Sequence, residues 1–305
     1  MITVVGSFVM DNVATMKRFP EAGETVLGER LGVYPGGKGI NQCVAARRLG
    51  AETAMVGMLG KDGNGEAFRA LMRAEGIAAE KVFESAEAAT GTAQVQIEES
   101  GQNRICVLPG ANYRFGIKEL EEAKETITKA EIVLAQLEIR MEVTERLSEM
   151  CEEAGVALML NPAPAAELPE RLLKRVTYLT PNEKELEKIS GMRVRDGEEA
   201  KRAAEALVKR GVKNVIATMG SRGALISNGE GSEAIAGYKV TAVDTVAAGD
   251  SFNGALAYGI TKGKSLRESV KIANAVGALT VTKKGAVPSL PYLREVLDFL
   301  KTVSC

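Results

Sequence analysis

Residues 244–252 read Asp-Thr-Val-Ala-Ala-Gly-Asp-Ser-Phe and precede an apolar run that predicts a helix over 249–262. At the start of that helix the dipole favours an anion such as a phosphate. Backbone N–H groups can approach the anion because the side chains there are small: Ala247, Ala248 and Gly249. A carboxylate at Asp250 can then take a proton from an attacking hydroxyl. An ordinary acidic helix cap explains the same residues, and this segment alone does not separate the two.

A second glycine cluster lies at 34–42 and reads Tyr-Pro-Gly-Gly-Lys-Gly-Ile-Asn-Gln. The spacing from Gly32 to Lys38 nearly matches a P-loop. However, Gly39 has no hydroxyl for Mg²⁺, and no strand is expected directly before the loop, so we disfavour a P-loop NTPase. The glycines instead allow the backbone to close on a small polyhydroxy ligand, with Lys38 and Asn41 supplying hydrogen bonds.

Composition sets broad limits on the protein. The chain has 305 residues, 45% of them hydrophobic, and can bury a large core. It has no apolar run near the ~18 residues of a transmembrane helix. The opening 1–6 reads as a buried strand and not as a signal peptide, so we expect a cytoplasmic location. The net charge of −1 gives no electrostatic basis for binding nucleic acid or a membrane.

Two residue types narrow the chemistry. The chain has no histidine, which excludes a Ser-His-Asp triad, a His-ligated metal and an imidazole base. Proton transfer therefore falls to other side chains, and Asp250 is well placed for it. Neither a zinc site nor a disulfide framework is expected, because the cysteines are widely scattered. We expect free thiols at Cys43, Cys106, Cys151 and Cys305.

Strand-like apolar runs alternate with amphipathic helices, which is typical of a layered α/β domain with a mainly parallel sheet. Strands are expected over 3–6, 54–59, 132–137, 156–161, 178–180 and 215–219. Helices are expected over 66–75, 141–154, 198–210, 265–282 and 292–300. No linker divides the chain, so 1–305 should form a single domain. Two segments that break the alternation, 25–33 and 93–107, read as short strands separated by turns such as Ser100-Gly101-Gln102.

Four motifs, in this order along the chain, resemble those of the ribokinase-like carbohydrate kinases: Gly36-Gly37-Lys38-Gly39-x-Asn41-Gln42, Asn161-Pro162-Ala163-Pro164, Thr180-Pro181-Asn182-Glu183-x-Glu185, and the run from Asp244 to Asp250. The match extends from Gly6 to Ser289. This resemblance implies a layered α/β/α fold. It also implies that the short strands at about 25–33 and 93–107 form a small β lid over the substrate, shared between the subunits of a homodimer.

Ligands of an open parallel sheet bind beyond the carboxyl ends of its strands, where Asp11 and Glu138 are expected. The resemblance implies a sugar site made by Asp11, Gly37, Lys38, Asn41, Glu138 and Asp250. A turn at Asp11 and a solvated Glu138 are the alternatives. Many members of the family carry Asn two positions before the sugar-binding Asp. Val9 stands there in this chain, which weakens the case for ribose in particular.

The resemblance also implies an ATP site built from the C-terminal half. Its implied residues are Asn182, Thr218, Gly220, Ser221, Gly223, Gly249 and Asn274. Glu185 is implied to hold water bound to Mg²⁺. Each assignment has an alternative: a plain hairpin turn for 218–223, a helix cap with an acidic first turn for Asn182 and Glu185, and an exposed helix position for Asn274.

A monovalent-cation site is the last implication of the resemblance. The segment 280–289 is implied to return to the Asp244 loop and bind an activating K⁺. The implied ligands are the Asp244 carboxylate, the carbonyls of Val246, Thr280, Lys283 and Gly285, and the Ser289 hydroxyl. A helix C-cap with a basic last turn explains the same tail.

The implied reaction is ATP-dependent phosphorylation of the primary hydroxyl of a free sugar, first of all D-ribose to D-ribose 5-phosphate. Asp250 would be the general base and Ala247–Gly249 the anion hole. A fructose, deoxysugar or nucleoside kinase on the same scaffold is the alternative. A sugar- or nucleotide-binding regulator without turnover is disfavoured, because the base and the anion-hole glycine are both present.

Overall fold

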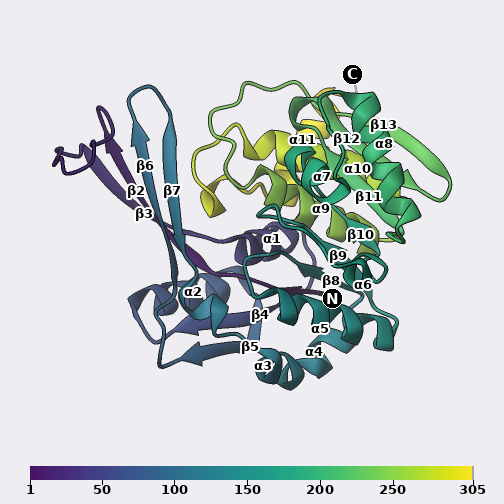
Figure 1. Ribbon diagram of the computed structural model, residues 1–305, viewed down its shortest axis with the longest axis horizontal. Coiled ribbons are helices and arrows are strands. Elements are labelled where there is room, and N and C mark those ends of the chain that lie inside the picture. The colour runs from purple at the N-terminus through teal and green to yellow at the C-terminus, as the bar shows by residue number, and fades with distance from the viewer. Residues whose placement is uncertain (304–305) are drawn as a thin grey trace.

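Nine strands form the central sheet of the protein in a computed structural model that describes residues 1–303 (Figure 1). The strand order is β13-β12-β11-β10-β9-β8-β1-β4-β5, and all neighbours from β11 to β5 are parallel. The strands are β1 (Ile2–Val5), β4 (Thr53–Gly60), β5 (Ala78–Ser85), β8 (Ile132–Ala135), β9 (Ala157–Leu160), β10 (Tyr178–Leu179), β11 (Asn214–Thr218), β12 (Gly223–Asn228) and β13 (Gly231–Ala236).

Helices cover both faces of this sheet. One core contains α3 (Ile117–Glu122), α4 (Lys124–Thr128), α5 (Met141–Ala154), α6 (Glu170–Leu173), α7 (Glu183–Ser190) and α8 (Gly197–Lys209). The other contains α1 (Lys38–Arg48), α2 (Gly63–Glu75), α9 (Ala248–Thr261), α10 (Leu266–Thr280) and α11 (Leu293–Val303). Alternate side chains of β1 enter different cores, since Val4 joins the second and Val5 the first. The expected layered α/β/α fold is confirmed.

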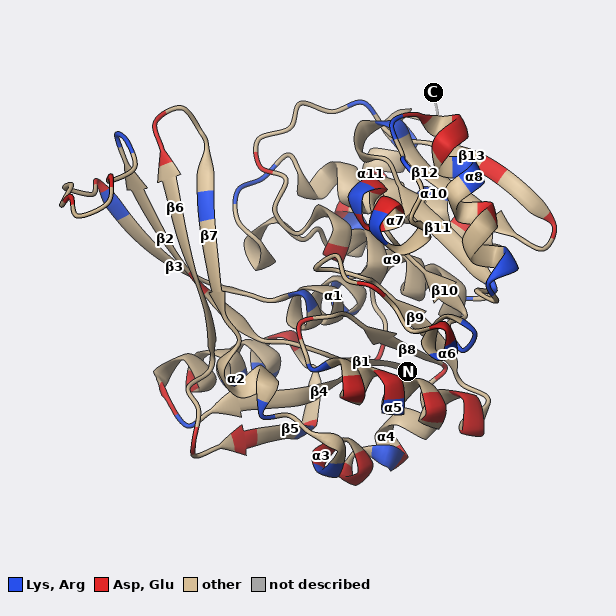
Figure 2. Cartoon of the chain, in the orientation of Figure 1, with Lys and Arg blue, Asp and Glu red and all other residues tan. Residues whose placement is uncertain are grey.

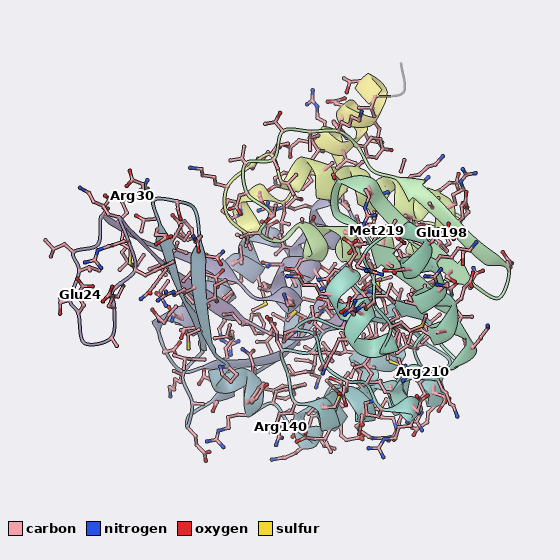
Figure 3. The ribbon with its side chains drawn as sticks, turned by 45° about the horizontal axis from the view of Figure 1, so that its top comes forward. Glu24, Arg30, Arg140, Glu198, Arg210 and Met219 are labelled. Carbon is pink, nitrogen blue, oxygen red and sulfur yellow. The ribbon has the colours of Figure 1, made fainter. Side chains whose placement is uncertain are left out.

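A second sheet of four strands projects from the body in the order β3-β2-β6-β7 (Figures 1 and 3). Its strands are β2 (Val9–Met16), β3 (Arg30–Gly36), β6 (Gly91–Glu98) and β7 (Asn103–Leu108). Figure 3 places Glu24 and Arg30 at its outer end. The strand expected over 25–33 therefore lies later in the chain. The segment 93–107 contributes to two strands on either side of residues 99–102, in agreement with the turn expected at 100–102. Strand β2 was not expected from the sequence.

The entry into α1 corrects one argument made from the sequence. Strand β3 ends at Gly36, two residues before α1 begins at Lys38, so a strand does lead directly into the glycine loop. This strand belongs to the projecting sheet and not to the central parallel sheet. The missing hydroxyl at Gly39 is the argument against a P-loop that still holds.

Asn112 fixes the chain where it passes from one sheet to the other. Asn112 belongs to a short 3-10 helix, η1 (Gly110–Tyr113), and its side chain is buried. Its Oδ1 accepts the Phe8 N–H at 2.9 Å, and its Nδ2 donates to the Phe8 carbonyl at 2.7 Å. Phe8 lies between β1 and β2, outside both sheets. The Asn112 amide therefore provides the hydrogen bonds that a neighbouring strand would otherwise make with the Phe8 backbone.

Charged side chains lie mainly on the outer helix surfaces and at the loop tips (Figure 2). Within residues 1–303, no helix is both long and apolar enough to cross a membrane. Cys43 and Cys151 are buried free thiols and Cys106 is an exposed one, as expected. Cys305 lies outside the described residues.

Candidate active site

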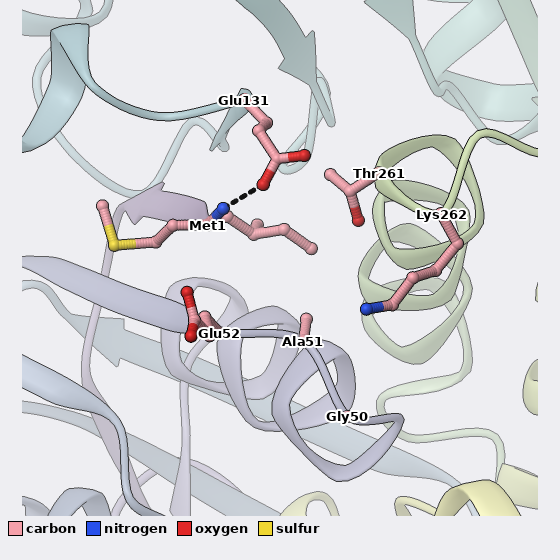
Figure 4. A pocket seen from close by; sticks show the side chains of 8 residues that line it. Met1, Gly50, Ala51, Glu52, Glu131, Thr261 and Lys262 are labelled. Atoms are coloured by element: carbon pink, nitrogen blue, oxygen red, sulfur yellow. Dashed lines mark hydrogen bonds and ion pairs between the residues drawn. The ribbon is translucent and has the colours of Figure 1, made fainter.

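A cavity of about 1400 Å³ lies between the carboxyl edge of the central sheet and the projecting sheet. It is lined by β2, β3, β6, β7, the start of α1 and the loop 242–247. A smaller cavity of about 260 Å³ lies at the amino edge, where the Met1 amino group pairs with Glu131 (Figure 4). Ligands of parallel sheets bind at the carboxyl edge. The large cavity is therefore the candidate active site.

Asp250 lies at the wall of this cavity, in the first turn of α9, and its residue is only 7% exposed. One carboxylate oxygen accepts a hydrogen bond from Asn41 Nδ2 at 2.9 Å, and the other accepts from Gln42 Nε2 at 3.2 Å. Both amides come from the first turns of α1. Two neutral donors hold the carboxylate without neutralising it, which leaves it able to accept a proton.

The backbone just before Asp250 is shaped to receive an anion. Ala247 has φ 61°, the one positive φ of a non-glycine residue between residues 1 and 303. Such strain is characteristic of functional sites. In the described chain the N–H groups of Ala247 and Gly249 donate to no protein acceptor. A Cβ at Gly249 would meet nothing within 4 Å, so the space above these amides is open.

Glu138 forms hydrogen bonds at the start of α1. The alternative, a freely solvated Glu138, is therefore wrong. Its Oε2 accepts the Lys38 N–H at 3.0 Å and a hydrogen bond from the Ser7 hydroxyl. Its Oε1 lies 4.0 Å from Lys38 Nζ. Ser7 in turn accepts the Gly39 N–H at 3.3 Å. Glu138 thus caps α1 while it lines the cavity beside Asn41.

Lys38 is the central positive charge of the site. Burial lowers the pKa of its ammonium group, but the surrounding carboxylates outweigh this effect and raise the pKa above its usual value. They are Asp250, Glu138, Glu185 and Asp11. Lys38 therefore stays protonated and can bind an anionic or hydroxyl ligand.

Asp11 lies within strand β2, so the alternative of a turn is wrong. Its carboxylate has no hydrogen-bond partner within the described residues and lines the cavity. Burial, with the negative charges of Glu138 and Asp250, raises the pKa of Asp11 to about 6, although Lys38 opposes the shift. An unpaired carboxylate of this kind gains most from a ligand that donates hydroxyl hydrogens.

Asn182 and Glu185 form a reciprocal cap on α7. Asn182 accepts the Glu185 N–H at 2.9 Å, and Glu185 accepts the Asn182 N–H at 2.8 Å. The capping alternative is thus confirmed. Burial raises the pKa of Glu185. Thr218, at the end of β11, forms a bridge with Asn182 and so lies next to this cap.

The other predicted nucleotide residues form the turn between β11 and β12 and its support. Gly220 and Ser221 lie in a short 3-10 helix, η2 (Gly220–Arg222), and the two strands form the hairpin that was the alternative. A Cβ at Gly223 would lie 2.1 Å from the Ile235 carbonyl, so packing requires glycine there. Asn274 is buried and donates to Ile235 and Ala236, so an exposed position is wrong.

Asp244 joins the two loops expected to bind K⁺. It accepts the Val246 N–H at 3.0 Å and the Gly285 N–H at 2.9 Å. The Lys283 side chain pairs with Glu295, and the buried Ser289 hydroxyl donates to Ala286. Helix α10 ends at Thr280, and Val281 is its C-cap. The last turn of this helix contains no basic residue, so the alternative of a C-cap with a basic last turn is wrong.

The structure brings ten of the 22 predicted site residues to the walls of one cavity. Its walls include Asp11, Gly37, Lys38, Asn41, Glu138, Asp244, Val246, Ala247, Asp250 and Gly285. The other predicted residues do not line it: Ala248, Gly249, Asn182, Glu185, Thr218, Gly220, Ser221, Gly223, Asn274, Thr280, Lys283 and Ser289. Sequence reasoning gave no role at the base to Gln42, although its place after Asn41 in the glycine motif could have suggested one.

The fold and the cavity together define a carbohydrate kinase. More particularly, the chain belongs to the pfkB family of carbohydrate kinases, which it matches over residues 1–293. The resemblance inferred from the four motifs is thereby confirmed.

Three relatives show how close the similarity is. The chain is 36% identical over 300 residues to the ribokinase of Haemophilus influenzae, with 98% of each chain covered. It is 31% identical over 300 residues to the deoxyribokinase of Salmonella typhi, again with 98% of each covered. The structure of Arabidopsis thaliana ribokinase complexed with ribose and ATP superimposes with a TM-score of 0.91, at 31% identity and 98% coverage of both chains.

The raised pKa of Asp11 predicts that sugar binding weakens in mild acid. The ionised carboxylate would accept sugar hydroxyls, and its ionised fraction falls as the pH drops below about 6. The Kd for ribose of the ATP-free protein should therefore rise about tenfold from pH 7 to pH 5. Calorimetric titration measures this change. Asp11→Asn should bind more weakly, with little pH dependence, and an unchanged pH dependence in this variant would contradict the assignment.

Proposed function

We propose that the protein transfers the γ-phosphoryl group of ATP to the primary hydroxyl of D-ribose and so forms D-ribose 5-phosphate. The observation that carries the proposal is Asp250, held by two amides beside the open N-terminus of α9. The ribokinase from Haemophilus influenzae and the ribose and ATP complex of the Arabidopsis enzyme support the choice of substrates.

In this proposal each group has one step of the reaction. Asp11, Lys38 and Glu138 bind and orient the sugar hydroxyls, with Gly37 and Asn41 at the same wall. Asp250 accepts the proton of the primary hydroxyl while the hydroxyl oxygen bonds to the γ-phosphorus, and the bond from that phosphorus to the β,γ-bridging oxygen breaks to release ADP. The free amides of Ala247 and Gly249, with that of Ala248, then stabilise the charge on the transferring group.

ATP would lie along the C-terminal half of the carboxyl edge. Thr218, Gly220 and Ser221 present a turn at the end of β11, beside the cap made by Asn182. Glu185 would hold water bound to Mg²⁺, which suits this metal because Mg²⁺ keeps much of its hydration shell. Gly223 and Asn274 would support this turn through β13.

An activating K⁺ would bind between the Asp244 loop and the segment after α10. Within residues 1–303, the carbonyls of Val246, Lys283 and Gly285 accept no hydrogen bond, so these oxygens are available to a cation. The Asp244 carboxylate, the Thr280 carbonyl and the Ser289 hydroxyl would complete an all-oxygen set. The ion would order the loop that carries the anion-hole amides.

A deoxyribose is the second candidate substrate. Val9 lines the cavity two residues before Asp11 and cannot form a hydrogen bond with a sugar hydroxyl. An apolar contact there favours a sugar that lacks one hydroxyl. The deoxyribokinase of Salmonella typhi, at 31% identity, agrees with this alternative. Identifying the phosphorylated products from ribose, 2-deoxyribose, fructose and nucleosides distinguishes the candidates.

The projecting sheet would also pair two subunits. Leu31 and Val33 of β3 are 72% and 52% exposed, and they alternate with Gly32 and Tyr34, which line the cavity. They therefore lie on the outer face of the sheet. Such an apolar face fits a second copy of the same sheet. A cytoplasmic location remains a prediction from the sequence.

Asp250→Asn should lower kcat for ribose phosphorylation by about 10²–10⁴-fold, because the carboxamide keeps the shape but cannot take the proton. Steady-state assays of ADP release measure this change. Asp196→Asn is the matched control, since Asp196 only caps α8 and Asn caps helices equally well. A loss below about fivefold in Asp250→Asn would remove the residue from the role of base.

Activity should rise with KCl and much less with NaCl at equal ionic strength, because simple screening treats the two salts alike. Rates measured over a range of each salt test this. Asp244→Ala should flatten the response to K⁺ while Asp250 stays in place. Full activity in sodium-only buffer, without gain from potassium, would defeat the K⁺ site and leave the kinase assignment standing.

Leu31→Lys combined with Val33→Lys should convert a dimer into a monomer, because two buried charges per subunit would have no partners. Sedimentation velocity measures the change. Leu297→Lys is the control, since Leu297 is 49% exposed on α11, away from the projecting sheet. A monomeric wild-type protein at micromolar concentration would contradict pairing through this sheet.

A further inference from the structure

A chain of buried amides runs behind Asp250, along the carboxyl edge of the central sheet. Gln136 follows β8, Asn161 follows β9 and Thr180 follows β10. Gln136 Nε2 donates to Gln42 Oε1 at 2.7 Å. Gln42 Nε2 donates to Asp250 Oδ1 and to Asn161 Oδ1, both at 3.2 Å. Asn161 Nδ2 donates to the Thr180 carbonyl at 3.1 Å. These bonds connect the base to the rigid sheet.

The orientation of the Gln42 amide follows from its neighbours. An ionised carboxylate can only accept hydrogen bonds, so the NH₂ group of Gln42 must face Asp250. The oxygen then faces Gln136, whose NH₂ group is the donor. Gln42 and Gln136 are both fully buried, so water cannot replace either bond. A rotated amide would place its oxygen against the carboxylate, which the Gln136 bond prevents.

We propose that Gln42 is a positioning residue for the reaction, which orients the Asp250 carboxylate toward the sugar hydroxyl, and that Gln136 fixes the Gln42 amide. The inference rests on the proposed phosphoryl transfer. Gln42 does not line the cavity, so it acts through Asp250 and not on the substrate. Asn41 holds the other carboxylate oxygen. If the Gln42 bond were lost, the carboxylate could rotate about the remaining hydrogen bond from Asn41.

A double-mutant cycle between Gln42 and Asp250 tests this role. Gln42→Met keeps the length of the side chain and removes its hydrogen bonds. It should lower kcat about 10- to 100-fold, the usual worth of a hydrogen bond to a charged group, with the KM for ATP changed less than about threefold. In an Asp250→Asn background the same substitution should cause no further loss, because there is no base left to orient.

A purely structural role for Gln42 gives a different result. The losses in kcat would then multiply in the double variant, or kcat in Gln42→Met would stay within about twofold of wild type, and either outcome overturns the inference. Asn214→Leu is the matched control. Asn214 starts β11 at the amino edge and donates to the Thr177 carbonyl at 3.1 Å. Its loss should lower Tm without lowering kcat.

Gln136→Met covers the case in which Gln42→Met does not fold. The Oε1 of Gln136 is buried without a partner in the described chain, so the substitution also removes an unsatisfied acceptor. Gln136→Met should lower kcat several-fold in the wild-type background and cause no further loss of kcat in the Asp250→Asn background. Equal losses of kcat in both backgrounds would count against the proposal. The cycle uses whichever sugar the wild type turns over fastest, so a wrong choice of ribose leaves the test intact. A wild type without turnover on any sugar would overturn the proposed function itself.

Discussion

Burial of the Asp250 carboxylate is the constraint on which the arrangement of the site depends. A buried charge is costly unless hydrogen bonds replace its water. The donors are Asn41 and Gln42 on α1, so α1 and α9 must approach closely. Gly254 permits this, because a Cβ there would lie 2.6 Å from the Gln42 carbonyl. The packing of two helices against one face of the sheet and the chemistry of the base thus share the same contacts.

Helix α1 also connects Asp250 to the cavity wall that contains Lys38 and Glu138. The N-terminus of α1 follows directly from β3, and Glu138 caps it through the Lys38 N–H. A Cβ at Gly39 would lie 2.4 Å from the Ser7 backbone nitrogen, which presses the helix start onto the crossover between the two sheets. Asn112 holds the next residue, Phe8, on both backbone groups. The base of the projecting sheet and the start of α1 are therefore held together by the same contacts.

The sequence predicted the parts of the fold that depend on local pattern. The helix over 141–154 agrees with α5, and the strands near 54–59 and 215–219 agree with β4 and β11 within one residue at either end. Strand β2 was missed because Asp11 and Asn12 interrupt its apolar pattern, and Asp11 lines the cavity instead of the core. The residue bounds expected for β3 were too early in the chain, because its apolar residues are exposed and so do not mark a buried face.

Only those parts of the candidate site that lie within a single sequence motif could be predicted from the sequence. Asp250 and Asn41 stood out from their glycine surroundings, but the Gln42 to Gln136 bond joins residues 94 positions apart in the chain. No local pattern encodes such a contact. The alternative for Asn274 was wrong for the same reason, since its side chain donates to the distant strand β13. The alternative for Asp11 was wrong because β2 itself was missed.

The charge balance of the site explains why an all-protein pocket is insufficient for this chemistry. Lys38 is the one basic side chain acting on the pKa of Asp11, against the carboxylates of Glu138 and Asp250, and Glu185 adds a further negative charge to its surroundings. A polyphosphate entering this field is repelled unless cations and backbone amides compensate. The α9 amides supply part of that compensation without adding a proton donor that could neutralise the base. Under the proposed function, bound cations would supply the rest of the compensation.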